Sequence, residues 1–375
     1  SSGNPDPLST DLCELAPSCI RSIAPYQPGK PIGELARELG IANIVKLASN
    51  ENPRGPSPLA LRAIADALPD LALYPDGGGY DLKTAIAEKF SVNRDQIVLG
   101  NGSNDVLELA ARAFLTAGTS AVYSHHAFIV YPLVTQATGA RGIVVPAKDY
   151  GHDLDAMARA IRADTRIVFI ANPNNPTGTF VPSEQLLGFL RAVPDDVLVV
   201  LDEAYTEYLP DKIKPPGPRW LPEFPNLLIT RTFSKAYGLA GLRVGFGLVR
   251  PEIADLMDRI RQPFNVNYLA LIGATAALRD EDFVRASFAL NQRGLRQLTA
   301  GFERLGLSYI PSYGNFISVR VGNAGAVYQH LLREGVIVRP IAGYGMPEHL
   351  RVTVGLEEEN ERFLRALQCA LAALR

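Results

Sequence analysis

Lys235 is the residue of this 375-residue chain whose surroundings point most directly to covalent chemistry. It stands in the run RTFSKAYG, residues 231–238, among small and hydroxyl side chains directly after an apolar stretch. A lysine amine that is desolvated beyond the end of a strand has a lowered pKa and can act as a nucleophile. For this residue taken alone, the alternative is a surface lysine whose stem packs on the protein.

Two other segments place polar side chains directly after apolar runs. Asp202 and Tyr205 follow the run 197–201, although an Asp after a buried strand is often a helix cap or a loop residue. Residues 172–178, NPNNPTG, follow the run 167–170 and predict a rigid turn because they are rich in Pro, Asn and Gly. One X-Pro bond in this turn is a candidate for the cis form.

Residues 100–105, GNGSND, follow the run 97–99 and open a helical pattern. Backbone N–H groups at a helix N-terminus form a cradle for phosphate, and this segment predicts one. It differs from the dinucleotide-binding pattern GxGxxG by having Asp105 at the third glycine. Residues 77–79 are also glycines, but they do not follow a strand pattern and predict a flexible turn.

The apolar runs that carry these side chains alternate with helical patterns, which indicates an α/β fold. The runs 167–170 and 197–201 are continuously apolar, as in strands that helices cover on both faces of a mostly parallel sheet. In such sheets ligands bind beyond the carboxyl ends of the strands. The predicted strands are residues 97–99, 121–123, 142–145, 167–170, 197–201, 227–230 and 244–249.

The pattern changes after Pro251, where a helix-rich segment extends to about residue 305. Two β-like runs, 316–321 and 350–354, then flank a helix at 324–334, and a last helix begins near Glu357. This part of the chain predicts a second, smaller α+β domain. Residues 212–222 contain four prolines and predict a surface loop.

The composition excludes several classes of protein. Hydrophobic residues make up 47% and charged residues 20%, as in a globular protein, and the net charge of -2 gives no global attraction to nucleic acid or to an anionic membrane. No apolar run is long enough to span a bilayer, and we expect a soluble, cytoplasmic enzyme. Cys13, Cys19 and Cys369 lack metal-binding spacing and predict free thiols and no metal site. The proline-rich stretch up to residue 31 predicts an extended arm, of a kind that often packs on a partner subunit.

Taken together, the strand-end segments resemble the active site of the fold-type I aminotransferases that depend on pyridoxal 5'-phosphate (PLP). The sequence has Asn-Pro-Thr-Gly at 175–178, Asp-x-x-Tyr at 202–205, and Ser-Lys at 234–235 with Arg243 eight residues after the lysine. Within that superfamily the chain is most similar to the histidinol-phosphate aminotransferase family over nearly its whole length. Further matching motifs are KLASNENP at 46–53, YPDG at 74–77, GNGSN at 100–104 and the stretch from Arg339 to Gly355.

The resemblance implies the PLP-transferase fold of type I: a large domain with a mostly parallel seven-stranded sheet between helices, and a smaller α+β C-terminal domain. We accordingly divide the chain into three parts. These are the N-terminal arm with the start of the small domain at 1–50, the large PLP-binding domain at 51–260, and linking helices with the small domain at 261–375.

The resemblance also implies how the cofactor would be held. Lys235 would bind PLP covalently and move a proton between the substrate's α-carbon and the cofactor, and Asp202 would pair with the pyridine nitrogen. Tyr205 and Asn175 would hydrogen-bond the 3-oxygen of the ring, and Phe128 would stack on its face. The residues implied for the cofactor phosphate are Ser103, Asn104, Thr232, Ser234 and Arg243.

For the substrate, the resemblance implies that Arg351 clamps an α-carboxylate or a phosphate, with Arg339 and Asn175 assisting and Tyr26 closing the site. Tyr74 would reach the cofactor phosphate of a neighbouring subunit, which makes the expected active protein a homodimer with shared active sites. A structural ion pair is the alternative for the two arginines, and simple packing of the arm is the alternative for Tyr26.

Some residues depart from the family pattern. The segment 124–128, SHHAF, stands where many relatives have a Pro followed by Ser or Thr before the aromatic residue. We expect His125 and His126 to make structural hydrogen bonds and assign them no catalytic role.

The implied activity transfers the amino group of L-histidinol phosphate to 2-oxoglutarate, giving imidazole-acetol phosphate and L-glutamate, a step of histidine biosynthesis. Two alternatives keep the cofactor: an aromatic amino acid aminotransferase, and a phospho-amino-acid decarboxylase, which would release carbon dioxide. A nucleotide-binding protein would need a glycine at position 105 and leaves Lys235 unexplained. A non-catalytic protein of the same fold is disfavoured because every expected cofactor contact is present.

Overall fold

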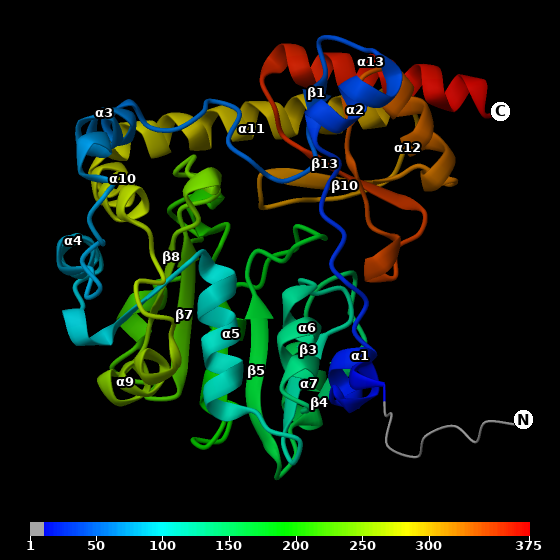
Figure 1. Cartoon of the computed structure of the whole chain (residues 1–375). Coiled ribbons are helices and arrows are strands. Elements are labelled where there is room, and N and C mark those ends of the chain that lie inside the picture. Colours follow the sequence, from blue (N-terminus) through cyan, green and yellow to red (C-terminus); the bar gives the residue numbers. More distant parts are fainter. Residues whose placement is uncertain (1–10) are drawn as a thin grey trace, which may run out of the picture.

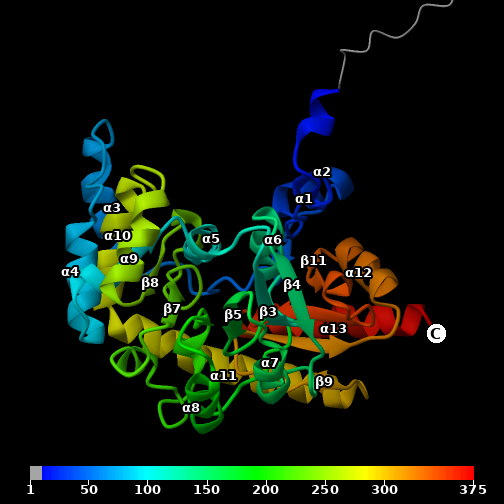
Figure 2. The same cartoon turned by 90° about the horizontal axis from the view of Figure 1, so that it is seen from below.

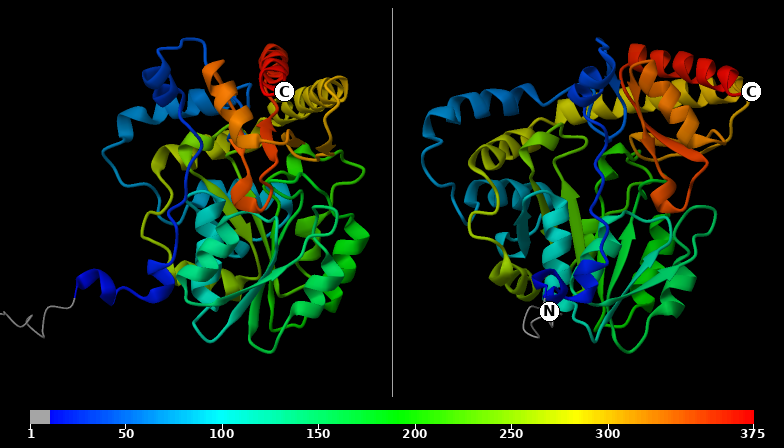
Figure 3. Two further views of the ribbon diagram at one scale, coloured as in Figure 1. Left: turned by 90° about the vertical axis from the view of Figure 1, so that its right-hand side faces the viewer. Right: turned by 45° about the vertical axis from the view of Figure 1, so that its right-hand side comes forward.

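A computed structural model describes residues 11–375, so the beginning of the predicted arm lies outside the described residues. The described chain forms two domains, a larger one built on a seven-stranded sheet and a smaller one built on a four-stranded sheet (Figure 1). After α1 (Ser18–Arg21), an extended segment runs along the molecule to α2 (Ile32–Leu39) beside the small domain, as Figure 3 shows. The chain then forms β1 (Val45–Lys46) and enters the large domain.

All seven predicted strands of the large sheet are present. The sheet has the order β2-β8-β7-β6-β5-β3-β4, and β8 is antiparallel to both of its neighbours while the other pairs are parallel. The strands are β2 (Ile97–Gly100), β3 (Ser120–Ser124), β4 (Arg141–Val145), β5 (Thr165–Ala171), β6 (Leu198–Asp202), β7 (Leu227–Thr232) and β8 (Gly245–Leu248).

Helices cover both faces of this sheet, which explains the continuously apolar runs. Along β5, Val168 and Ile170 pack on one side and Ile167 and Phe169 on the other. One face is covered by α4 (Tyr80–Phe90), α7 (Leu154–Ala160), α8 (Ser183–Ala192) and α10 (Tyr268–Arg279), with α3 (Pro58–Ala67) packed on α10. The other face is covered by α5 (Ser103–Phe114), α6 (Val130–Ala137) and α9 (Pro251–Ile260).

The small domain contains the two predicted strands and the predicted helix, together with shorter strands that the sequence analysis missed. Its antiparallel sheet has the order β12-β13-β10-β9, and β1 pairs in parallel with β11. The strands are β9 (Tyr309–Ile310), β10 (Phe316–Arg320), β11 (Val336–Ile337), β12 (Arg339–Pro340) and β13 (His349–Thr353). The helices are α11 (Glu281–Arg304), α12 (Ala324–Arg333) and α13 (Glu357–Ala373).

The structure corrects the prediction of a surface loop at 212–222. Its first half is partly exposed, but the second half forms the short helix η5 (Gly217–Trp220), and Trp220 and Leu221 are buried in the core of the large domain. Gly217 lies against the carboxylate of Glu203, where a side chain would clash. The second half of this proline-rich segment therefore packs inward, because burying its apolar side chains lowers the free energy of the folded protein.

Candidate active site

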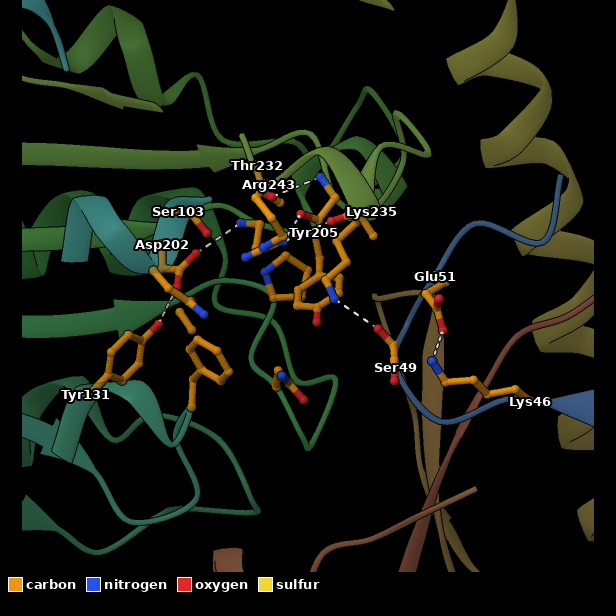
Figure 4. A pocket seen from close by; sticks show the side chains of 18 residues that line it. Lys46, Ser49, Glu51, Ser103, Tyr131, Asp202, Tyr205, Thr232, Lys235 and Arg243 are labelled. Atoms are coloured by element: carbon orange, nitrogen blue, oxygen red, sulfur yellow. Dashed lines mark hydrogen bonds and ion pairs between the residues drawn. The ribbon is translucent and has the colours of Figure 1, made fainter. Parts of the chain in front are cut away.

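A cavity of about 260 Å³ lies beyond the carboxyl ends of strands β5, β6 and β7, as Figure 4 shows. Strands β7 and β8 are antiparallel neighbours, so the loop 233–244, which carries Lys235, leaves and re-enters the sheet at this edge. Gly100, at the end of β2, pairs with Gly245 of β8 and brings the start of α5 to the same place. The predicted residues that line the cavity are Ser103, Asn104, Phe128, Asn175, Asp202, Tyr205, Thr232, Ser234, Lys235 and Arg243.

The amine of Lys235 points into this cavity (Figure 4). Its Nζ donates a hydrogen bond of 3.0 Å to the carbonyl oxygen of Ser49 and lies 5.8 Å from the centre of the Tyr205 ring. Burial, reinforced by the positive charge of Arg351, lowers the pKa of Lys235 to about 7. The amine is therefore available in its neutral, nucleophilic form near neutral pH, which a surface lysine would not be.

Asp202 ends strand β6 and is 5% exposed. The backbone N–H of Ala204 donates to one carboxylate oxygen at 3.1 Å, and the hydroxyl of Tyr131 donates to the other at 2.7 Å. Burial raises the pKa of Asp202, and the Tyr131 hydroxyl opposes that rise because it stabilises the carboxylate. The pKa of this buried carboxyl therefore depends on the two groups that donate hydrogen bonds to it.

The start of α5 forms a pocket for an anion. The N–H groups of Ser103 and Asn104 belong to the first turn of the helix, where backbone donors have no helical partner and the helix dipole favours negative charge. Gly102, with φ of +81°, lies against the guanidinium of Arg243, and a side chain there would collide with it. Arg243 also donates to the hydroxyl of Ser234 at 3.1 Å. These donors match the phosphate cradle predicted from the sequence.

Arg351 lies in the small domain and meets the large domain at Asn175. Its guanidinium donates to the side-chain oxygen of Asn175 at 2.7 Å and to the carbonyl oxygen of Ala48 at 2.8 Å. It is 6% exposed, and no carboxylate of residues 11–375 lies within salt-bridge distance of it. Since both protein acceptors are uncharged, the structural ion pair considered for this arginine is not formed. Its charge remains available for an anionic ligand.

Arg339 and Tyr26 do not line the cavity but lie together in a neighbouring hollow of about 690 Å³ between the arm, α6 and the small domain. Arg339 donates to the carbonyl oxygen of Gln27 at 2.8 Å, and its guanidinium lies 5.6 Å from the centre of the Tyr26 ring. In this structure Tyr26 therefore packs in the arm and touches one of the predicted substrate arginines.

Tyr74, another predicted site residue, lies outside both the cavity and the neighbouring hollow. It is 81% exposed, and its ring stacks on Phe264 at 4.8 Å between ring centres. Other exposed apolar or aromatic side chains, among them Leu61, Leu71, Leu73 and Tyr80, lie on α3, α4 and the connection between them. Figure 2 shows α3 and α4 on one side of the molecule with α10.

Several residues in or next to the cavity wall were not predicted from the sequence. Lys46 and Glu51 form an ion pair of 2.8 Å there, and Asn50 donates to the hydroxyl of Tyr205 at 2.9 Å. The motif KLASNENP was the available signal for these residues, but it carries no information about which cavity they face. The available signal for Tyr131 was its spacing of three residues from Phe128. In the structure the two rings pack edge to face, with 5.8 Å between their centres.

The residues present fit PLP. The structure combines an amine with a lowered pKa, a buried acid, an aromatic ring and a phosphate cradle that glycines keep open, all around one cavity. Within residues 11–375 there is no cluster of His, Cys, Asp and Glu that could hold a metal ion. No helix of the described chain is long and apolar enough to cross a membrane.

Comparisons with known proteins agree with these features. The model of the family "Aminotransferase class I and II" matches residues 42–367. The chain is 64% identical to histidinol-phosphate aminotransferase 2 of Nitrosospira multiformis, with 96% of this chain and 93% of the relative covered, and 63% identical to histidinol-phosphate aminotransferase of Methylobacillus flagellatus, with 96% and 98% covered. The crystal structure of histidinol-phosphate aminotransferase from Sinorhizobium meliloti in complex with PLP is similar, with a TM-score of 0.89, 30% identity and 96% and 98% of the two chains covered. These similarities confirm the predicted fold class.

Proposed function

The chain belongs to the aminotransferase class I and II family, and from this premise we propose that it is a PLP-dependent histidinol-phosphate aminotransferase. It transfers the amino group of L-histidinol phosphate to 2-oxoglutarate and releases imidazole-acetol phosphate and L-glutamate, as a step of histidine biosynthesis. The observation that carries the chemistry is the Lys235 amine, with its lowered pKa, in one cavity with Asp202 and the phosphate cradle. The substrate assignment rests on the names of the nearly full-length relatives.

When bound, PLP supplies an electron sink for the negative charge left at the substrate's α-carbon. Asp202 would hold a proton at the pyridine nitrogen, Tyr205 and Asn175 would bind the 3-oxygen, and Phe128 would cover one face of the ring. The N–H groups at the start of α5 and the guanidinium of Arg243 would bind the cofactor phosphate. The hydroxyls of Ser103, Thr232 and Ser234 and the amide of Asn104 complete this cradle.

Lys235 then acts as the base and acid of the reaction. With a pKa of about 7, its Nζ can both remove and return a proton at neutral pH, and the Ser49 carbonyl oxygen accepts its hydrogen bond. Arg351 would bind the phosphate of histidinol phosphate or the α-carboxylate of glutamate, since both are anions that a guanidinium can chelate. Arg339 and Tyr26, held together beside the cavity, would complete the substrate site when the arm moves.

We also propose that the protein acts as a homodimer in which Tyr74 reaches the partner's cofactor phosphate. Support comes from Tyr74 itself, which is exposed, and from its chain neighbours Leu71 and Leu73, which are exposed as well. An apolar surface of this kind is typical of a contact between subunits. The proposed location is the cytoplasm, in agreement with three cysteines that are all free thiols.

The proposal is tested by titrating the PLP-loaded protein with L-histidinol phosphate, L-phenylalanine and L-tyrosine while the cofactor absorbance is recorded. We expect histidinol phosphate to discharge the lysine-bound cofactor band at a far lower concentration than either aromatic acid. A preference for an aromatic acid would contradict the substrate and keep the chemistry, and release of carbon dioxide from a phospho-amino acid would indicate a decarboxylase. A spectrum that no donor changes would contradict the aminotransferase itself.

A further inference from the structure

His126 connects the large domain to the small domain. It lies in the turn between β3 and α6, and its Nδ1 is 2.6 Å from the carbonyl oxygen of Tyr344 in the short helix η7 (Ala342–Tyr344) of the small domain. A carbonyl oxygen only accepts, so the hydrogen of this bond is on Nδ1. Burial lowers the pKa of His126, which favours the neutral ring.

The backbone of His126 is tied to the candidate active site from the other side. Its carbonyl oxygen accepts a hydrogen bond of 2.9 Å from the side-chain amide of Asn174. The next residue, Asn175, accepts the bond from Arg351, and Phe128 lies two residues after His126. His126 therefore contacts three parts of the molecule: its own loop, which carries Phe128, the loop of Asn174 and Asn175, which binds Arg351, and the small domain.

The packing around this hydrogen bond is close. Gly345 follows η7 with φ of +75°, and a Cβ at this position would come within 2.8 Å of the His125 ring. The rings of His125 and His126 are 4.4 Å apart between centres, so the segment 342–345 lies against a pair of imidazoles. Tyr344 is half-buried and lines the hollow that also contains Tyr26 and Arg339.

We propose that His126 is a positioning residue, whose Nδ1–H fixes the segment 342–345 on the large domain and so places Tyr344 in the hollow beside Arg339, one of the proposed substrate arginines. The proposal rests on the proposed function, because it assumes that the donor binds between Arg351 and the arm. The chemistry at Lys235 does not depend on this bond. Its loss therefore weakens substrate binding and leaves turnover at saturation nearly unchanged.

The test compares His126→Phe, which keeps a ring and removes the donor, with His126→Asn, whose side-chain amide places an N–H close to the position of Nδ1. Loss of one neutral hydrogen bond should raise the KM of His126→Phe for histidinol phosphate by about 3- to 10-fold over that of the native protein. We expect a kcat within about twofold of the native value, an unchanged absorbance of the bound cofactor, and recovery of KM in His126→Asn. An unchanged KM in His126→Phe would overturn the proposal, as would a loss confined to kcat.

A second measurement does not depend on turnover. The N–H groups of Tyr344 and Gly345 are bonded within the turn at 3.0 Å each, and we expect them to exchange with deuterium faster in His126→Phe than in the native protein. Amides of α13 serve as the internal reference and keep their rates. Equal exchange at residues 344 and 345 in both proteins would refute the positioning role.

Gly345→Ala provides a second variant with an intact His126. The added methyl group collides with the His125 ring and separates the segment from the large domain, so the same rise in KM and the same faster exchange are expected. If the native protein does not react with histidinol phosphate, the proposed function is wrong, but the role of His126 can still be tested. The exchange experiment decides, without any turnover, whether His126 holds the segment 342–345 on the large domain.

Discussion

Tyr131 is the residue that most directly controls the acid at the end of β6. Its hydroxyl donates to Asp202 at 2.7 Å, and its ring is fully buried and stacks on Phe169 at 4.8 Å. The hydrogen bond stabilises the charged form of Asp202 in a place where burial favours the neutral form. In the proposed role of Asp202, this balance would determine how well its carboxylate keeps a proton at the pyridine nitrogen of PLP.

Tyr131→Phe removes the hydroxyl and keeps the ring. We expect the pKa of Asp202 to rise further, kcat to fall by about 10- to 100-fold, as for a lost hydrogen bond to a buried charge, and PLP to bind more weakly. The measurements are kcat and the dissociation constant of PLP. Tyr123→Phe is the matched control, because Tyr123 is also a buried residue and its hydroxyl lies against Gly142, and full activity of Tyr131→Phe would contradict the role given to Tyr131.

The lowered pKa of Lys235 gives a prediction for cofactor-free protein. An amine reagent attacks only the neutral form, so modification of Lys235 should reach half its maximal rate near pH 7, against about pH 10.5 for an ordinary lysine. Below pH 7 the ammonium form predominates and reaction slows. Peptide mapping after treatment with trinitrobenzenesulfonate at several pH values measures this midpoint.

Arg351 contributes to that lowered pKa because its positive charge disfavours the ammonium. In Arg351→Gln we therefore expect the midpoint for Lys235 to move to higher pH. A midpoint above pH 9 in the native protein would show that the amine is solvated and would remove the argument for its reactivity.

Between β6 and β7 lies a buried group of charges that the proposed reaction does not use. Arg231 of β7 donates to Glu203 at 3.0 Å and lies 4.0 Å from Glu207, and all three side chains are nearly inaccessible. Burial raises the pKa of Glu207 to about 7 despite the nearby arginine. Unfolded Glu207 titrates near 4.5, so between these values the folded protein binds more protons, and the stability due to this carboxyl falls as the pH rises.

Glu207→Gln removes this titration. Relative to native protein, we expect the variant's free energy of unfolding to improve by up to about 3 kcal/mol between pH 4.5 and pH 8. Urea unfolding of both proteins at several pH values measures the difference, in which the other titrating groups cancel. Glu223→Gln, at an exposed carboxylate paired with Arg191, is the control and should show little change. A pH-independent difference for Glu207→Gln would mean that Glu207 is charged in the folded state.

The elements that the sequence predicts well are those whose signal is local. The seven strands of the large sheet are recognisable in the sequence as apolar runs. Asp202 and Lys235 follow two of these runs, at the strand ends beyond which ligands bind in parallel sheets. Strands such as β1 and β11 have two residues each, too few for any periodicity, and form only by pairing across the chain. The hydrogen bonds of Asn50 and Tyr131 were missed for the same reason, since each joins residues far apart in sequence.

The molecule as a whole presents an apolar surface on α3 and the connection to α4. Leu61 on α3, and Leu71 and Leu73 in the connection that also carries Tyr74, are each at least half exposed. If this surface joins two subunits, the double variant Leu61→Glu, Leu71→Glu should sediment as a monomer and lose most of its activity, because Tyr74 would no longer reach a partner's site. Leu374→Glu, at an exposed leucine near the C-terminus, is the control. A fully active monomer would contradict the role proposed for Tyr74.

Lys46, Ser49 and Glu51 line the cavity, and the hydrogen-bond partners of the segment 47–50 between them lie far along the chain, at residues 337–353. Leu47 bonds to Ile337 and Thr353, Ala48 to Arg351, and Asn50 to Thr353. During synthesis on the ribosome, the segment leaves the exit tunnel some 300 residues before these partners, as the separation of 303 between Ala48 and Arg351 indicates. Nascent chains therefore cannot complete the proposed PLP site before residues 337–353 have been synthesised, and we expect cofactor capture only after that point of synthesis.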